Sequence, residues 1–562
     1  MHKININIII EIGNFRQEFS LELDLLTKFN RGLCLSLIDT NVVEAIRMYR
    51  EYTSYLHSKD NEESFKNELI AVRVAFLNKL AKFIEDDKNK DKNGDLIACY
   101  QELIAAFPNE ANFYIKCADC FYNIEQYDIQ AELLNKALEI SPFDIEIMKA
   151  LFQAYEKAEK LEEAKTLAEN IIEKEPENAD NYYSLGAIYD KLYNKYEKEE
   201  YIKSAILNIE IAKKINPNKK LYHKALTILY TKTGDWGKVK EAWDNCFRFK
   251  NELTNTELVN YGMFLIRMGD FKNGLEFYEK RFITETKAVK YPEINKPLYD
   301  GKKDISGKTL LVQTEQGFGD VFLFSRFFHD LKNKNIKIIA RVPNTTIDIV
   351  KRSFPFVEVV SAKKSLDEIN FDYHIPLMSI PRAIGLNKEN IPHKEKYLFA
   401  DAKKTLEFKN NLFNNNKFKI GVNFKGSERG LQTRDVPLDA LIPLTMIEGV
   451  QVYSVQYMEP DETYKDTNII NLAKYIKTFD DTASIIENMD LMITADNSTM
   501  NLSGALGKNT FCLFNMIPEF RWFDLKGNDV KWYGSVKPYQ CKKQSDWKPV
   551  IEKTVEDIKK MI

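Results

Sequence analysis

The sequence predicts two kinds of structure in one chain, an array of α-helical repeats followed by an α/β part with parallel sheets. Two observations support this prediction. Prolines recur every 34 residues in the first half, and beyond residue 282 short apolar runs alternate with helix-length segments. At 562 residues the chain is too long for a single core, and its length predicts roughly three to four domains.

The helical repeats are marked by prolines that follow short polar segments. Pro108, Pro142 and Pro176 are separated by steps of 34 residues. A fourth proline, Pro217, lies 41 residues further on, which is one period plus seven. The insert "YNKYEKEEYI" absorbs the extra residues as about two helical turns. The spacing therefore predicts helical units of 34 residues, one of them lengthened.

Residue types at the repeat positions support the same prediction. One unit has residues suited to the packing positions of a first tetratricopeptide helix, namely Tyr182, Leu185, Gly186 and Tyr189. Gly234 and Gly269, in two later turns, lie 35 residues apart. By period and residue type, residues 98–285 resemble a tetratricopeptide-repeat superhelix. Residues 1–97 show no repeat register, and we expect an atypical N-terminal capping region there.

The second half predicts parallel β-sheets. Short apolar runs, separated mostly by helix-length segments, are typical of buried parallel strands in an α/β fold. Nine strands suit two doubly wound halves. A polar helix predicted over 401–417 divides these halves into domains at 286–400 and 401–562. The predicted strands are "KTLLVQ", "IKIIARV", "FVEVVS", "YHIPL", "FKIGVNF", "VQVYSVQ", "NIINL", "LMITA" and "TFCLFN".

Composition argues against several classes of protein. The chain carries 80 Lys and Arg residues against 83 Asp and Glu residues, so a net charge of −3 gives no electrostatic basis for binding nucleic acid. The start, "MHKININIIIEIG", does not resemble a secretory signal, and its apolar stretch is too short for a transmembrane segment. Seven scattered cysteines predict a reduced, cytoplasmic protein. Cys117 and Cys120 form an isolated pair within a repeat helix, so no metal site is predicted there.

Six blocks of the second half follow the order and spacing of a known group. They are "YEKRF" with "PLYDGKKDISGKTLLVQTEQGFGD", "YHIPLMSIPRAIG", "KIGVNFKGSERGLQTRDVPL", "VYSVQ", "FDDTASIIENMDLMITADNSTMNLSGALGK" and "FRWF…VKWYGS". On these blocks the chain resembles bacterial tetratricopeptide-repeat glycosyltransferases. Their catalytic half is similar to heptosyltransferases and, more distantly, to O-linked N-acetylglucosamine transferase. The resemblance implies a GT-B fold, two Rossmann-like domains with a nucleotide-sugar in the cleft, and neither a metal nor another cofactor.

The loop "TEQGFGD" (314–320) connects the first predicted strand of this half to a helix expected to begin at Asp320. Such a turn faces the ligand crevice of an open parallel sheet, and Gly317 and Gly319 let backbone N–H groups approach a bound group. By resemblance to heptosyltransferases, Asp320 is the general base for the acceptor hydroxyl, with Glu315 as the alternative. A carboxylate at a helix start is stabilised as an anion, so a capping role is the other interpretation of Asp320.

Transfer from a nucleotide-sugar requires positive charge or helix N-termini near the departing phosphate. Lys425 follows a predicted strand where the family has a phosphate-contacting region, and Arg434 matches the family arginine before Pro-Leu. Gln456 ends another strand at the cleft side and is a candidate for contacting the base. Solvated surface positions are the alternative interpretation of the two cations.

The segment "ITADNSTMNLSGALGK" (493–508) is predicted to form a strand followed by a helix of small residues. The resemblance implies that Asp496 lies near the sugar or ribose hydroxyls. Asn497, Ser498 and Thr499 are predicted to cap the helix or to bind phosphate oxygens. Asn501 stands where the family usually has His, and asparagine neither titrates near neutral pH nor carries charge.

These features predict a metal-independent glycosyltransferase that moves a sugar from a nucleotide-sugar donor to a hydroxyl acceptor. We expect the repeat groove to present the acceptor, a protein (protein O-glycosylation) or a glycan. The replacement at Asn501 supports an alternative function, a catalytically impaired nucleotide-sugar-binding or tetratricopeptide scaffold protein.

Overall fold

The structure is a computed structural model that describes residues 93–562 apart from 288, 393, 427–432 and 523–529, together with residues 75, 76, 78 and 79. The predicted capping region over 1–97 therefore lies almost entirely outside the described residues. The chain divides into two compact units, Met1–Tyr222 and His223–Ile562. None of the helices in this described part has the length and hydropathy needed to span a bilayer.

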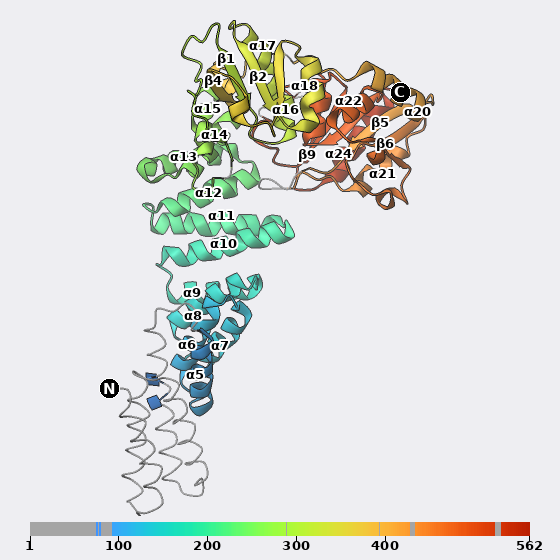
Figure 1. Ribbon diagram of the computed structural model, residues 1–562. Helices are drawn as coiled ribbons and strands as arrows, with labels where there is room; N and C mark the ends of the chain where they lie inside the picture. Colours follow the sequence, from blue (N-terminus) through green and yellow to red (C-terminus); the bar gives the residue numbers. More distant parts are fainter. Residues whose placement is uncertain are drawn as a thin grey trace, which may run out of the picture. The chain divides into compact units, whose positions relative to one another are not determined.

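The described part of the first unit is a tetratricopeptide-like stack of antiparallel helices (Figure 1). Apolar stripes hold the helices together, as in α8, where Ile147, Met148 and Leu151 are buried and Asp144 caps the first turn. The helices are α5 (Asn93–Ala106), α6 (Ala111–Asn123), α7 (Tyr127–Ile140), α8 (Ile145–Lys157), α9 (Leu161–Lys174), α10 (Ala179–Tyr196) and α11 (Glu199–Ile215). Helix α8 begins at Ile145 and α10 at Ala179, which is 34 residues later and confirms the predicted period.

The seven extra residues of the predicted long unit lengthen both of its helices. Helix α10 has 18 residues against 13 in α8, and α11 has 17 against 14 in α9. Gly186 lies where these long helices approach each other, because a Cβ there would stand 2.6 Å from Ile209 Cδ1. The small residue predicted at this packing position is therefore required by the close approach.

The repeat-like helices continue into the second unit, where they pack with the α/β part. Val259, Ile266, Phe271 and Leu275 belong to the same hydrophobic core as the first β-sheet. The boundary between the two compact units thus precedes the last helical hairpins. These helices are α12 (Lys220–Thr233), which crosses the boundary, α13 (Trp236–Cys246), α14 (Asn255–Arg267) and α15 (Phe271–Tyr278).

The first sheet is parallel, in the order β3-β2-β1-β4. Leu310 of the central strand pairs with Ile338 on one side and Tyr373 on the other. The strands are β1 (Thr309–Gln313), β2 (Lys337–Val342), β3 (Val357–Ser361) and β4 (Tyr373–Pro376). The helices of this half are α16 (Phe318–Phe324), α17 (Phe328–Lys332), α18 (Ile347–Ser353) and α19 (Ile380–Ala383).

The second sheet is also parallel, in the order β10-β9-β8-β5-β6-β7. Its strands are β5 (Phe418–Asn423), β6 (Val450–Ser454), β7 (Ile469–Asn471), β8 (Leu491–Ala495), β9 (Thr510–Phe514) and β10 (Val536–Gln540). Its helices are α20 (Ala402–Leu412), α21 (Leu438–Thr445), α22 (Phe479–Glu487), α23 (Ser498–Ala505) and α24 (Trp547–Lys559). All nine predicted strands and the dividing helix are confirmed.

One continuous hydrophobic core joins the two sheets. It contains Leu310 and Val312 of β1 together with Met500 and Leu502 of α23, all of them almost fully buried. Because side chains from both halves fill one core, the elements that begin beside the two sheets are held at fixed positions relative to each other. Those elements include the loop after β1 and the start of α23.

Candidate functional site

The loop after β1 turns directly into α16. The helix begins at Phe318, with Gly317 as its N-cap, and not at Asp320 as the sequence predicted. Asp320 occupies the third helical position, and its Oδ2 accepts the backbone N–H of Gly317 at 3.0 Å. Asp320 therefore does take part in capping the helix, as the second interpretation proposed. The Gly317 N–H is already hydrogen-bonded to Asp320 and is not available to a ligand.

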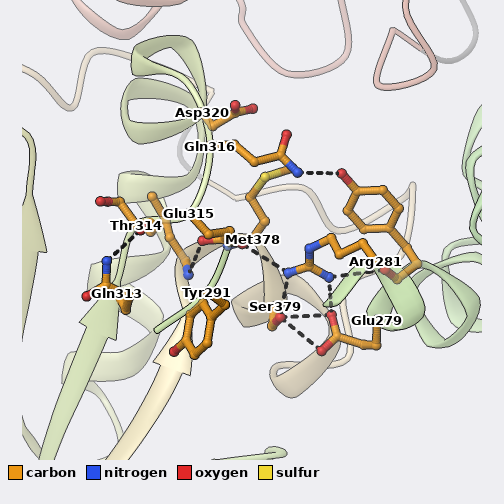
Figure 2. A network of polar contacts seen from close by, with 12 residues as sticks. Glu279, Arg281, Tyr291, Gln313, Thr314, Glu315, Gln316, Asp320, Met378 and Ser379 are labelled. Carbon is orange, nitrogen blue, oxygen red and sulfur yellow. Dashed lines mark hydrogen bonds and ion pairs between the residues drawn. The ribbon is translucent and has the colours of Figure 1, made fainter. Parts of the chain in front are cut away.

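Glu315, the alternative base, lies in a closed network on the opposite side of this loop (Figure 2). Its side chain has no exposed surface and accepts the backbone N–H groups of Leu377 and Met378, at 3.1 and 3.2 Å. It also pairs with Arg281 at 3.0 Å. Burial raises the pKa of Glu315 to about 7, against the opposing effect of Arg281. A carboxylate enclosed in this way ties β1 to the segment after β4 and is poorly placed to meet a substrate.

Arg281 completes that network from the end of the helical hairpins. The guanidinium donates to Glu279 at 2.7 Å and to Ser379 at 2.8 Å, and it lies over the rings of Tyr278 and Phe282. Figure 2 shows the arginine between its two carboxylate partners. A buried cation with these partners fixes the last helical segment to the loop that carries the candidate base.

The start of α16 packs against the start of α23. A Cβ added at Gly319 would lie 3.1 Å from Asn501 Nδ2 and 3.4 Å from the Cα of Ser498. The glycine predicted to admit a bound group thus admits a neighbouring helix. Through this contact the structure brings the predicted base Asp320 next to the predicted phosphate-binding segment, although the two lie far apart in the sequence.

The first turn of α23 is held by its own polar residues. Asn497 caps the helix by accepting the N–H of Met500 at 3.1 Å, and its amide donates to Asn423 and to the backbone oxygen of Lys425. Asn501 is buried and donates to the Asn497 backbone oxygen at 3.0 Å while accepting from Tyr533 at 2.9 Å. Asn497 and Asn501 thus have structural partners in place of a ligand.

Ser498 and Thr499 follow the cap in the first turn of α23. Thr499 is buried, whereas Ser498 is half-buried at the helix start. Backbone N–H groups of a helix start lack partners within the helix and favour anions. Of the two hydroxyl residues, Ser498 is therefore the better placed to meet a phosphate oxygen.

Asp496 is a buried carboxylate at the end of β8, only 5% exposed. Its Oδ2 makes no hydrogen bond of ordinary geometry among the described residues, although a looser contact with the Trp522 indole lowers the pKa of the carboxyl. Burial raises the pKa of Asp496 to about 6, with Arg434 as the largest opposing influence. An orphaned acceptor of this kind suits a ligand that supplies a hydroxyl donor, as a sugar or a ribose does.

Arg521, within the block "FRWF", is a further residue of this site. Its guanidinium pairs with Asp320 Oδ1 at 3.0 Å and with Glu519 at 3.2 Å, and it donates to Gln316 at 3.4 Å. The conspicuous Arg-Trp pair in "FRWF" was a signal for this position, but nothing in the sequence connected it to Asp320. In the described part of the chain, the ion pair of the candidate base Asp320 is made with Arg521.

Lys425 and Gln456 lie together at the ends of β5 and β6. The Lys425 ammonium pairs with Glu459 at 2.7 Å and its side chain is 47% exposed, while Gln456 accepts the Lys425 backbone N–H at 3.1 Å. Both side chains already have protein partners. Arg434 interacts electrostatically with Asp496 and lowers the pKa of that carboxyl. Of the two predicted cations, Arg434 is therefore the better placed to meet a ligand beside Asp496.

Metal ligation receives no support within the ranges that the structure describes, where no group of three or more His, Cys, Asp or Glu residues is arranged to hold an ion. Cys117 and Cys120 are buried in the helical stack, and burial raises the pKa of the Cys117 thiol to about 12. His374 is buried beside β1, where its Nδ1 lies 2.9 Å from the Tyr291 hydroxyl.

Comparisons with known proteins give weak similarities over different lengths. No protein-family model matches the chain. Protein FlbA of Caulobacter vibrioides is 21% identical over 567 residues, covering 91% of this chain and 92% of FlbA. Residues 41 to the end of MamA from Desulfovibrio magneticus RS-1 are 15% identical with a TM-score of 0.28, covering 32% of this chain and 96% of that one. A thermophilic tetratricopeptide protein of Thermus thermophilus is 20% identical with a TM-score of 0.26, covering 32% and 93%.

Proposed function

We propose that this chain is a glycosyltransferase of the GT-B type, with the donor bound between the two parallel-sheet halves. The observation that carries this proposal is the contact between the starts of α16 and α23. In this contact Gly319, next to the candidate base Asp320, lies against Ser498 at the start of α23. The strand leading into α23 ends beside Asp496, a buried carboxylate with an orphaned oxygen. Ligands of open parallel sheets bind at the carboxyl ends of the strands, where all three elements lie.

The proposed roles follow from charge and geometry. The acceptor hydroxyl gives its proton to Asp320, its oxygen bonds to the sugar C1, and the C1–oxygen bond to phosphate breaks with its electron pair on phosphate. Arg434 and the N-terminal amides of α23 stabilise the negative charge that develops there. Asp496 accepts a hydrogen bond from a hydroxyl group of the nucleotide-sugar. These groups supply the electrostatic stabilisation, so the proposal requires no metal.

The proposed acceptor is a protein segment or a glycan presented by the tetratricopeptide-like helices. Stacked helical repeats form extended surfaces suited to elongated partners. The first unit offers exposed aromatic side chains for such a partner, among them Phe143, 82% exposed, and Tyr196, 47% exposed. Aromatic residues supply large contact areas in protein recognition.

A second function is favoured by one observation, the replacement of the family histidine by Asn501. That side chain is buried and hydrogen-bonded on both sides, so it offers no proton and no charge to a departing phosphate. The alternative protein would bind a nucleotide-sugar, or act as a scaffold, without turnover.

One experiment distinguishes the two proposals. The purified chain is incubated with UDP-, GDP-, ADP- and CMP-sugars, and nucleotide release is measured together with thermal shifts. For the enzyme we expect release with one donor class, reduced at least about a hundredfold in Asp320→Asn, as for loss of a general base. Asp348→Asn is the matched control, because Asp348 is an exposed aspartate in the first turn of α18. A thermal shift without release would establish the binding protein instead.

A further inference from the structure

Arg521 contacts the opposite half of the site through its charged end. It follows β9, yet its guanidinium reaches Asp320 and Gln316 in the loop after β1, at 3.0 and 3.4 Å. Its second terminal nitrogen pairs with Glu519 at 3.2 Å. The side chain is 16% exposed, so these interactions are only partly screened by solvent. A residue that only packed would not need charged partners in both halves.

Both carboxylate oxygens of Asp320 face donors while Arg521 remains on it. Oδ1 takes the guanidinium, and Oδ2 takes the backbone N–H of Gly317 at 3.0 Å. A general base must instead lie within hydrogen-bond reach of the hydroxyl whose proton it accepts. In this arrangement Asp320 is poorly available to an acceptor hydroxyl, and its Oδ1 becomes available when the guanidinium leaves.

A competing anion position lies within reach of the same arginine. The start of α23 packs on Gly319, which directly precedes Asp320. Asp496, at the strand end leading into α23, is buried with an orphaned oxygen, and both Arg434 and Arg521 act on it electrostatically. Phosphate bound at this helix start would bring more negative charge to Arg521 than the single carboxylate of Asp320 does.

We propose that Arg521 is shared between Asp320 and the phosphate of the donor, so that an arriving donor takes the guanidinium and leaves Asp320 free to accept a proton. This inference rests on the proposed function. The freed carboxylate receives the acceptor proton while the sugar C1 exchanges its phosphate oxygen for the acceptor oxygen. Arg521 thereby makes the availability of the base depend on the presence of the donor, which suppresses proton transfer in the empty site.

The test measures nucleotide affinity by calorimetry on the full chain, with UDP, GDP, ADP and CMP as probes. Asp320→Asn removes the competitor for Arg521, so we expect the bound nucleotide to bind about five- to tenfold more tightly, a typical coupling between sites. Arg521→Gln removes the shared cation and weakens binding about tenfold or more. In the double variant the tightening disappears, and its affinity equals that of Arg521→Gln alone.

Asp480→Asn is the matched control. Asp480 pairs with Arg352 at 2.6 Å and with Lys404 at 3.1 Å, which joins α22 to α18 and α20, and no ion pair described links it to Arg521. Its loss should therefore leave nucleotide affinity unchanged. If the Asp320–Arg521 pair only supports the fold, Asp320→Asn weakens binding or leaves it unaltered, and the inference is wrong while the proposed function stands. If the unaltered chain binds none of the four nucleotides, the proposed function fails and the inference fails with it.

Discussion

The buried carboxylate of Asp496 provides a quantitative test of the site. Burial raises its pKa from 3.8 to about 6. Each tenfold change in proton affinity corresponds to about 1.4 kcal/mol, so above pH 7 the charged carboxylate lowers the stability of the free protein by about 3 kcal/mol. Asp496→Asn removes the charge, but its buried amide needs hydrogen-bond partners and loses part of this gain. We expect a net stabilisation of about 1–2 kcal/mol at pH 7.5.

The sign of the pH dependence follows from the direction of the shift. A carboxyl with a raised folded-state pKa contributes stability below its unfolded-state pKa, and that contribution is lost as the pH rises through about 6. The difference between Asp496→Asn and the unaltered chain should therefore be smallest near pH 4 and largest above pH 7. Scanning calorimetry at pH 4.5, 6.0 and 7.5 measures it, with an expected rise in Tm of about 2 °C at pH 7.5.

Asp557 serves as the opposite control. Its carboxylate accepts from Lys537 and Tyr539, at 2.7 and 2.8 Å, and these partners hold its pKa well below the usual range. Asp557→Asn should lower Tm at pH 7.5, with a smaller effect as the pH falls. If Asp496→Asn lowered Tm at pH 7.5, or shifted it equally at all three pH values, Asp496 would not be a destabilising buried charge, and its assignment as a ligand-binding acid would lose its physical basis.

Three further variants test the surrounding structure. Arg281→Met leaves Glu315 buried without its cation, so the free energy of unfolding should fall by about 3–5 kcal/mol at pH 8. The loss should be smaller at pH 5.5, where Glu315 takes up a proton. An equal loss at both pH values would contradict this. Gly319→Val should destabilise by about 1–3 kcal/mol in urea unfolding, because its side chain meets Asn501, whereas Gly317→Ala should be nearly neutral. Asn497→Ala removes the cap of α23 and should cost about 1 kcal/mol in the same assay; unchanged unfolding would show that the cap contributes nothing.

Much of the fold could be predicted because it depends on local sequence patterns. Nine apolar runs gave nine strands, since buried parallel strands are apolar along their whole length. The tenth strand, β10, was missed because it contains Pro538 and polar residues. It lies at the edge of the second sheet, the position where a strand tolerates proline.

The site was predictable only in part, because its contacts join distant segments. The strand-to-helix connections that carry Asp320 and Asp496 could be located from the pattern of strand and helix. The partners of Glu315 come from positions 281, 377 and 378, and the ion pair of Asp320 comes from Arg521. No periodicity in the sequence encodes such pairs. The start of α16 was misplaced by two residues because Gly317, lacking a side chain, caps the helix with Asp320 reaching back from inside it.

The hydrophobic core shared by the two sheets has a consequence for motion. Wide opening about a hinge requires a boundary that few buried side chains cross, whereas here Leu310 of one sheet and Met500 beside the other are parts of a single packed interior. Separating the halves would expose much of that interior to water. A ligand must therefore enter by displacement of loops and individual side chains. The two sheet-containing halves should also unfold together in one cooperative transition.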